Sequence, residues 1–144
     1  MDKNTEGAQL LRSGRVGEAI DVFRQAASEA AMHPEPQNNL AIALWQAGRR
    51  DEALQAMHSA IEIDPQHRAV VQNGIGMLAA VGEVNRARAL CELYLARHAD
   101  DEEIRQAHER LVAIATPLGH LPQTPSLSPT PIPELCDRPS VLNY

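Results

Sequence analysis

Aromatic residues are scarce in this chain of 144 residues, at 3% of the sequence, and no apolar run is long enough to span a membrane. Apolar residues of all kinds still make up 44%, so the core has to be built mainly from alanine, leucine, isoleucine and valine. Side chains this small suit helices that pack close together. The length is that of one domain.

Basic residues are also few. The chain has 13 lysines and arginines against 19 aspartates and glutamates, which gives a formal net charge of −6. Nucleic-acid backbones and anionic membranes attract proteins through a basic face. The charge therefore argues against nucleic acid and against a membrane as partner.

Cysteine occurs twice. Cys91 falls on the apolar stripe of an expected helix and Cys136 lies in the C-terminal tail. The favoured interpretation is a buried thiol and a free tail thiol, and the alternative is a disulfide between them. Residues 1–6 contain no apolar run behind a positive charge, so we expect no signal peptide and a cytoplasmic location.

Catalytic and cofactor motifs are missing from the sequence. There is no glycine-rich phosphate loop and no Gly-x-Ser-x-Gly. The six histidines lack the spacing of metal ligands; His33 and His67, for example, are one repeat period apart. We therefore expect no enzyme activity, no cofactor and no metal.

What the sequence does contain is a period of 34 residues. Glycine recurs with this step at Gly14, Gly48 and Gly82. The same step relates Ala19, Ala53 and Ala87, then Leu10, Leu44 and Leu78, and then Phe23, Met57 and Cys91. A period of this size indicates stacked repeats, each too small to bury its own apolar stripe.

Each period is predicted to hold two helices joined by a tight turn at glycine. The expected ranges are 3–13 with 16–31, 36–47 with 50–63, and 68–81 with 84–98. A seventh helix at 101–115 should cover the open end of the stack, with Asp100 as its N-cap and Glu103 completing a capping box. Seven of the ten prolines follow Ala115, so residues 116–144 are expected to be disordered or polyproline II.

These residues resemble the tetratricopeptide repeat. The central copy carries the family pattern as Leu40-Ala41, Leu44, Gly48, Ala53, Met57, Ala60 and Pro65. The first copy departs from it at Glu6-Gly7, and the third at Gly74-Ile75. The resemblance implies an all-α fold, a right-handed α-solenoid at 1–115 followed by the proline-rich tail at 116–144. The three repeats would span about 1–33, 34–67 and 68–101, with the capping helix at 101–115.

The resemblance also implies that the first helix of each pair lines a groove for a peptide. The groove face would present Thr5, Ala8 and Leu11, then Asn38, Asn39, Ile42 and Trp45, then Gln72, Asn73, Gly76 and Ala79. The partner-binding residues singled out are Leu11, Arg12, Asn38, Asn39, Ile42, Trp45, Gln72 and Asn73. Relatives that grip a C-terminal carboxylate use lysine and arginine on these helices. The matching positions are mostly neutral here, so that clamp is not expected.

Two alternatives stay open on this face. The asparagines, of which Asn39 and Asn73 are one period apart, either pair with the backbone of a ligand or cap and bridge adjacent helices. Trp45 is either an exposed anchor in the groove or part of the core.

The leading functional hypothesis is an adaptor or assembly scaffold that binds a partner protein segment in the groove. One alternative is a secretion-type chaperone for an unfolded client. Another is an accessory or carrier protein that presents its tail, with Cys136, to an enzyme. The tail is also long enough to bind back in the protein's own groove.

Overall fold

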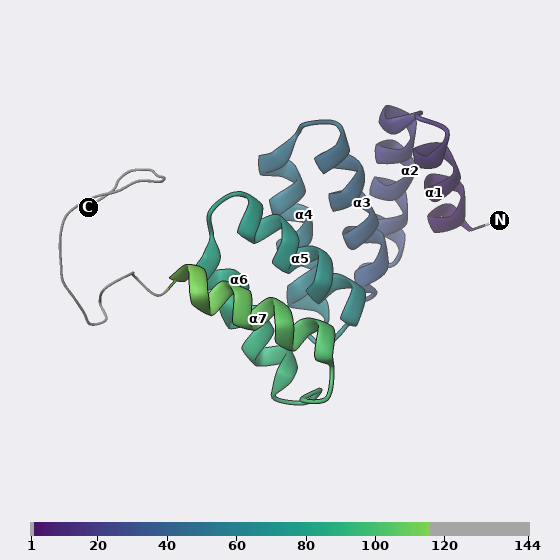
Figure 1. Cartoon of the computed structure of the whole chain (residues 1–144). Helices are drawn as coiled ribbons and strands as arrows, with labels where there is room; N and C mark the ends of the chain where they lie inside the picture. Colours follow the sequence, from purple (N-terminus) through teal and green to yellow (C-terminus); the bar gives the residue numbers. More distant parts are fainter. Residues whose placement is uncertain (1, 116–144) are drawn as a thin grey trace, which may run out of the picture. The chain divides into compact units, whose positions relative to one another are not determined.

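The structure is a computed structural model that describes residues 2–115, which form seven α-helices and no strand (Figure 1). In chain order the helices are α1 Lys3–Arg12, α2 Val16–Glu29, α3 Pro34–Gln46, α4 Arg50–Ile63, α5 Arg68–Ala80, α6 Val84–Leu95 and α7 Glu102–Ala115. The fold described below is the compact unit Met1–Leu111; of the unit that begins at Val112, only the last turn of α7 is described. The predictions for the tail and for Cys136 lie outside the described residues.

Helices α1 to α6 form three pairs, and successive pairs lie side by side (Figure 1). The turn inside each pair depends on a glycine in the left-handed region of backbone space, with φ of 82° at Gly14, 80° at Gly48 and 86° at Gly82. In the central turn the N–H of Arg49 donates to the carbonyl of Leu44 at 2.9 Å, which closes the end of α3. This is a Schellman turn, and it strains any residue with a Cβ. The predicted helix–turn–helix unit is confirmed.

The alanines that recur with the period are fully buried. Ala19, Ala53 and Ala87 are each 0% exposed. Because alanine has no long side chain to hold backbones apart, the two helices of each pair can pack at short distance. The core falls into two clusters, one that joins α2, α3 and α4 to Val70 and Met77 of α5, and one that joins α5 and α6 to Ile104 and Leu111 of α7. The seventh helix therefore covers the last repeat, as the sequence predicted.

From repeat to repeat, the residue at one core position becomes larger as the residue at a second core position becomes smaller. The first position holds Gly7, Ala41 and Ile75, and the second holds Phe23, Met57 and Cys91. In the first repeat a Cβ on Gly7 would lie 2.4 Å from Phe23 Cε1, so only glycine fits beside that ring. Cys91 is 0% exposed, and burial raises the pKa of its thiol to about 11, which keeps it protonated and unreactive. The prediction of a buried thiol is confirmed.

Three predicted helix ends were wrong by two or more residues. Helix α3 begins at Pro34 rather than at 36, because the first turn of a helix needs no N–H and accepts proline. Helix α2 ends at Glu29 rather than at 31. Helix α6 ends at Leu95 rather than at 98, and the N–H of His98 then donates to the carbonyl of Tyr94 at 3.0 Å in a turn.

Replacing a turn glycine tests the role of the left-handed backbone. Gly48→Ala should destabilise the fold by about 1–2 kcal/mol, because alanine disfavours this conformation although the space around it is open. Urea unfolding followed by helical circular dichroism measures the change. Gly17→Ala is the matched control, since Gly17 lies in α2 with nothing within 4 Å of its Cβ position. Equal effects of the two substitutions would contradict this account of the turn.

Candidate partner-binding groove

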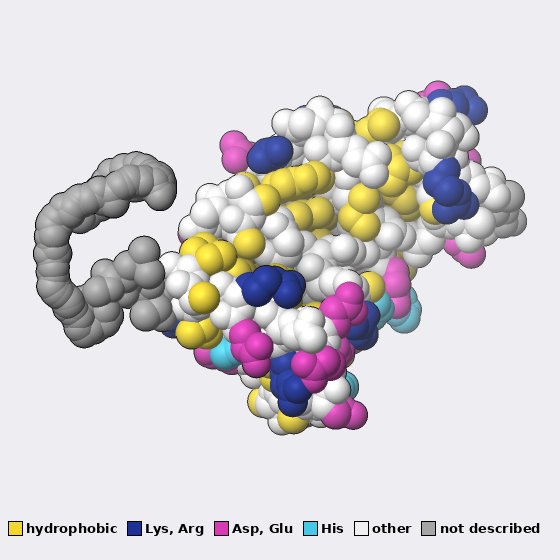
Figure 2. All heavy atoms as spheres, viewed as in Figure 1, with side chains coloured by type: hydrophobic (Ala, Val, Ile, Leu, Met, Phe, Trp, Pro, Cys, Tyr) yellow, Lys and Arg dark blue, Asp and Glu magenta, His cyan; other side chains and the backbone are white. Residues whose placement is uncertain are grey.

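A groove of about 330 Å³ runs between α3 and α5. Its walls are Ile42, Trp45 and Gln46 from α3, and Gln72, Asn73, Gly76, Met77 and Ala80 from α5. Figure 2 shows hydrophobic side chains gathered on the face between these helices. None of the eight lining residues carries a charge, so the groove offers apolar surface with amide groups at its edges.

The hollow exists because large residues on α3 face small ones on α5. Trp45 and Ile42 form one wall, and Gly76 and Ala80 form part of the other. A Cβ placed on Gly76 would meet nothing within 4 Å, so this glycine leaves open space rather than serving a tight contact. The groove is therefore a local feature of the second and third repeats.

Trp45 belongs to both the groove and the core. Its side chain is partly buried, lines the groove and also packs against the first core cluster. The guanidinium carbon of Arg50, the first residue of α4, lies 4.5 Å from the centre of the indole ring. This cation–π contact restrains the orientation of the ring, which still lines the groove. The two alternatives for Trp45, an anchor in the groove and a part of the core, therefore each describe one side of this residue.

The asparagines bridge adjacent helices. The Asn73 amide nitrogen donates to Asn38 Oδ1 at 3.0 Å, and one period earlier the Asn39 amide nitrogen donates to Asn4 Oδ1 at 3.4 Å. Asn38 is only 7% exposed. The structure thus supports the alternative in which the asparagines bridge helices, and burial corrects the expectation that Asn38 faces the groove. Asn39 and Asn73 are partly exposed, and Asn73 also lines the groove.

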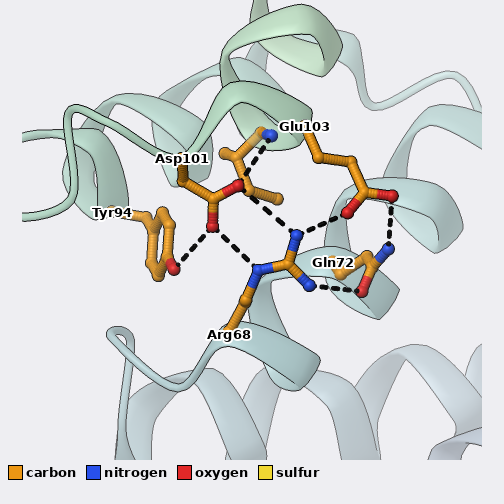
Figure 3. Close-up of polar contacts among 6 residues, drawn as sticks. Arg68, Gln72, Tyr94, Asp101 and Glu103 are labelled. Carbon is orange, nitrogen blue, oxygen red and sulfur yellow. Dashed lines mark hydrogen bonds and ion pairs between the residues drawn. The ribbon is translucent and has the colours of Figure 1, made fainter.

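A polar cluster joins the third repeat to α7 (Figure 3). Asp101 Oδ2 accepts from Arg68 Nε at 2.8 Å and from the Tyr94 hydroxyl at 2.9 Å. Its Oδ1 accepts from the backbone N–H of Ile104 at 3.3 Å, so Asp101 caps α7 and the prediction of Asp100 was wrong by one residue. Arg68 Nη2 also donates to Glu103 Oε1 at 2.5 Å.

The hydrogen bonds at Asp101 shift its own pKa and the pKa values of the side chains bonded to it. The hydrogen bond from Arg68, then those from Tyr94 and the Ile104 N–H, lower the pKa of Asp101 from 3.8 to about 2. The Arg68 pKa is raised by hydrogen bonds to Asp101 and Glu103. The Tyr94 pKa is raised by burial and by its bond to Asp101. Asp101 therefore keeps its negative charge to a lower pH than an ordinary aspartate.

Other sites are not found in the described part of the chain. Residues 2–115 contain no group of three or more histidine, cysteine, aspartate or glutamate side chains that could hold a metal. No helix among them is long and apolar enough to cross a membrane. Two of the histidines instead pair with glutamates, His67 with Glu35 at 3.2 Å and His108 with Glu92 at 3.0 Å.

Comparison with known proteins agrees with the stacked helix pairs. A tetratricopeptide repeat model matches residues 10–75 and again 45–111, which together span most of the chain. The chain belongs to the tetratricopeptide repeat family. A search of curated proteins found no match.

Solved tetratricopeptide repeat structures share the fold at low identity. The Sgt2 domain from Aspergillus fumigatus is 17% identical, with a TM-score of 0.70, 89% of this chain and 86% of that chain covered. The second domain of human RPAP3, solved in complex with an HSP70 peptide, is 15% identical, with a TM-score of 0.65 and coverages of 77% and 92%. The type III secretion translocator chaperone SycD of Yersinia enterocolitica is 16% identical, with a TM-score of 0.62 and coverages of 78% and 77%.

Within this tetratricopeptide repeat domain, half of the singled-out residues meet in one place. Ile42, Trp45, Gln72 and Asn73 line the groove. Those that do not line it are Asn38 and Asn39 in the helix bridges, Leu11 against the first core cluster, and Arg12, exposed at the end of α1. That any of the eight binds a partner stays a prediction.

Three lining residues were missed by the sequence analysis, namely Gln46, Met77 and Ala80. A signal for two of them was present, because Asn73, Gly76, Met77 and Ala80 follow the spacing i, i+3, i+4, i+7 of one helix face. Following that face to the end of α5 would have found them. Ala79, which was expected on this face, packs against the second core cluster instead.

The Asp101 cluster predicts how the last repeat responds to acid. Asp101→Asn keeps a capping oxygen but removes the charge that Arg68 pairs with, so the melting temperature at pH 7 should fall. Because the folded pKa of Asp101 is lowered, its contribution is complete above the ordinary value of 3.8 and is lost as the pH falls towards about 2. In thermal unfolding, the difference in melting temperature between wild type and Asp101→Asn should therefore shrink as the pH falls through this interval. Asp100→Asn is the control, and an equal loss there would contradict the assignment of the cap.

Proposed function

We propose that this chain is a protein-interaction module that binds a partner segment in the α3–α5 groove. The observation that carries the proposal is the apolar hollow formed by Ile42, Trp45 and Met77, with the amides of Gln72 and Asn73 beside it. The apolar walls favour an aliphatic or aromatic anchor, and the amides can pair with the backbone of the segment that carries it. The proposal assigns no catalytic role to the chain.

The free energy of burying one side chain in this groove is too small to account for binding by itself. Burying one aliphatic side chain contributes about 1.5–3 kcal/mol, whereas a dissociation constant of 1 mM already needs about 4 kcal/mol. The anchor must therefore be supplemented by contacts along the segment. Asn73 and Gln72 each keep hydrogen-bonding capacity beyond the bonds to Asn38 and Glu103, because a primary amide has two donors and two acceptor lone pairs.

The similar structures support an adaptor, since one of them is described with a bound HSP70 peptide and another as a secretion translocator chaperone. An adaptor in the cytoplasm is the form of the proposal we favour. A secretion-type chaperone uses the same groove, but it would bind many unrelated apolar segments. Binding by the protein's own tail, or presentation of that tail to an enzyme, stays a separate prediction.

Filling the hollow tests the proposal. Gly76→Leu should place an aliphatic side chain in the open space and block the anchor, while Gly76→Ala should leave binding intact and stabilise α5 by about 0.5–1 kcal/mol. The immobilised full chain would select from a display library of random 12-residue segments flanked on both sides by a common linker. We expect wild type and Gly76→Ala to enrich segments with an apolar anchor, and Gly76→Leu to lose that enrichment at least about tenfold.

Three outcomes are informative. Enrichment of one motif favours an adaptor, and enrichment of many unrelated apolar segments favours a chaperone. Enrichment that is equal in Gly76→Leu and wild type would place binding elsewhere and overturn the proposal. Circular dichroism of each variant confirms that the helices are retained.

A further inference from the structure

The charges around the groove are unevenly placed. Arg50 stacks on Trp45 at the end of the groove where α3 terminates. Within residues 2–115 its guanidinium makes no hydrogen bond or ion pair, whereas the neighbouring Arg49 is paired with Glu52 at 2.6 Å. Asp51, the next residue, is turned about 100° around α4 from Arg50. The Trp45 end of the groove thus carries a positive charge with its donors uncommitted.

The opposite end is acidic. Gln72 lines the groove there and donates from its amide nitrogen to Glu103 Oε2 at 3.4 Å. Arg68, whose guanidinium also donates to Gln72 Oε1 at 3.4 Å, is shared between Glu103 and Asp101. Within this cluster two carboxylates face one guanidinium, which leaves a surplus of negative charge beside Gln72.

These two ends are far enough apart to act separately. Gln72 and Ala80 are eight positions apart on α5, which corresponds to about 12 Å at 1.5 Å per residue. At physiological ionic strength the screening length is about 8 Å. A segment in the groove therefore meets a positive field at one end and a negative field at the other, with uncharged walls between them.

We propose that the groove selects an internal segment in which an aliphatic side chain lies within one turn of an aspartate or glutamate, with that carboxylate on Arg50. This inference rests on the proposed function and specifies its partner. The aliphatic side chain enters the hollow beside Gly76, and the carboxylate accepts from the guanidinium over Trp45. An acidic side chain at the Gln72 end would be repelled by Glu103, so the segment binds in one direction.

The carboxylate is assigned to a side chain because of where Arg50 lies. Arg50 stands on Trp45 and is not among the residues that line the groove. A bound segment whose backbone lies against Ile42 and Met77 would contact Arg50, which is outside the lining, through one of its side chains. The stacked guanidinium is also held in place by the indole ring, so it loses less rotational freedom on binding than a free arginine would.

The same display library tests this specificity. The measured quantity is the excess of aspartate and glutamate within four positions of the enriched aliphatic residue. Wild type should show this excess, and Arg50→Gln should reduce it about threefold to tenfold while keeping the aliphatic preference. Arg50→Lys should retain part of it. Arg86→Gln is the matched control, because Arg86 is an exposed arginine on α6 that pairs with Glu83 at 3.6 Å.

The outcomes separate the two proposals. An aliphatic motif that Gly76→Leu abolishes, but with no acidic excess or with one that Arg50→Gln leaves unchanged, overturns the specificity and leaves the groove function standing. Enrichment unaffected by Gly76→Leu, or no enrichment at all, overturns both. A second library with free C-termini checks the source of the carboxylate. An acidic preference that appears only there would overturn the assignment to an internal side chain.

Discussion

The close approach of the two helices in each pair is the constraint on which the rest of this structure depends. It requires an alanine with no exposed surface at Ala19, Ala53 and Ala87, and a turn tight enough to bring the second helix straight back. The left-handed glycine supplies that turn. Once the pair is formed, each apolar stripe is only half covered, and stacking of the next pair covers the remainder.

Stacking in turn determines what the polar residues of the first helices can do. Amides at equivalent heights on α1, α3 and α5 bond to one another, and Gln72 continues the series to Glu103 of α7. These bonds fix the orientation of the amides, and the apolar side chains of Ile42, Trp45 and Met77 lie beside them in the groove between α3 and α5. Arg50, which lies outside the groove lining, keeps a guanidinium that makes no hydrogen bond or ion pair within residues 2–115.

Differences between the repeats are as informative as their agreement. In the core, a glycine beside Phe23 and an isoleucine in the repeat with Cys91 keep the packing similar from pair to pair. On the groove face no such balance holds, because Ile42 in the second repeat is followed one period later by Gly76, and both line the groove. This change in residue size opens the hollow between α3 and α5.

The sequence by itself determined the period, the helix pairs and the turns, since glycine at a left-handed position and alanine at a buried one follow from local sterics. It also identified Ile42, Trp45, Gln72 and Asn73 as members of one face. It could not show that Asn38 is buried, that Asp101 caps α7, or that Arg50 lies on Trp45. Those facts depend on the distance and rotation between neighbouring helices. Only the tertiary structure decides that geometry, because packing of side chains far apart in sequence sets which polar atoms meet each other and which remain free.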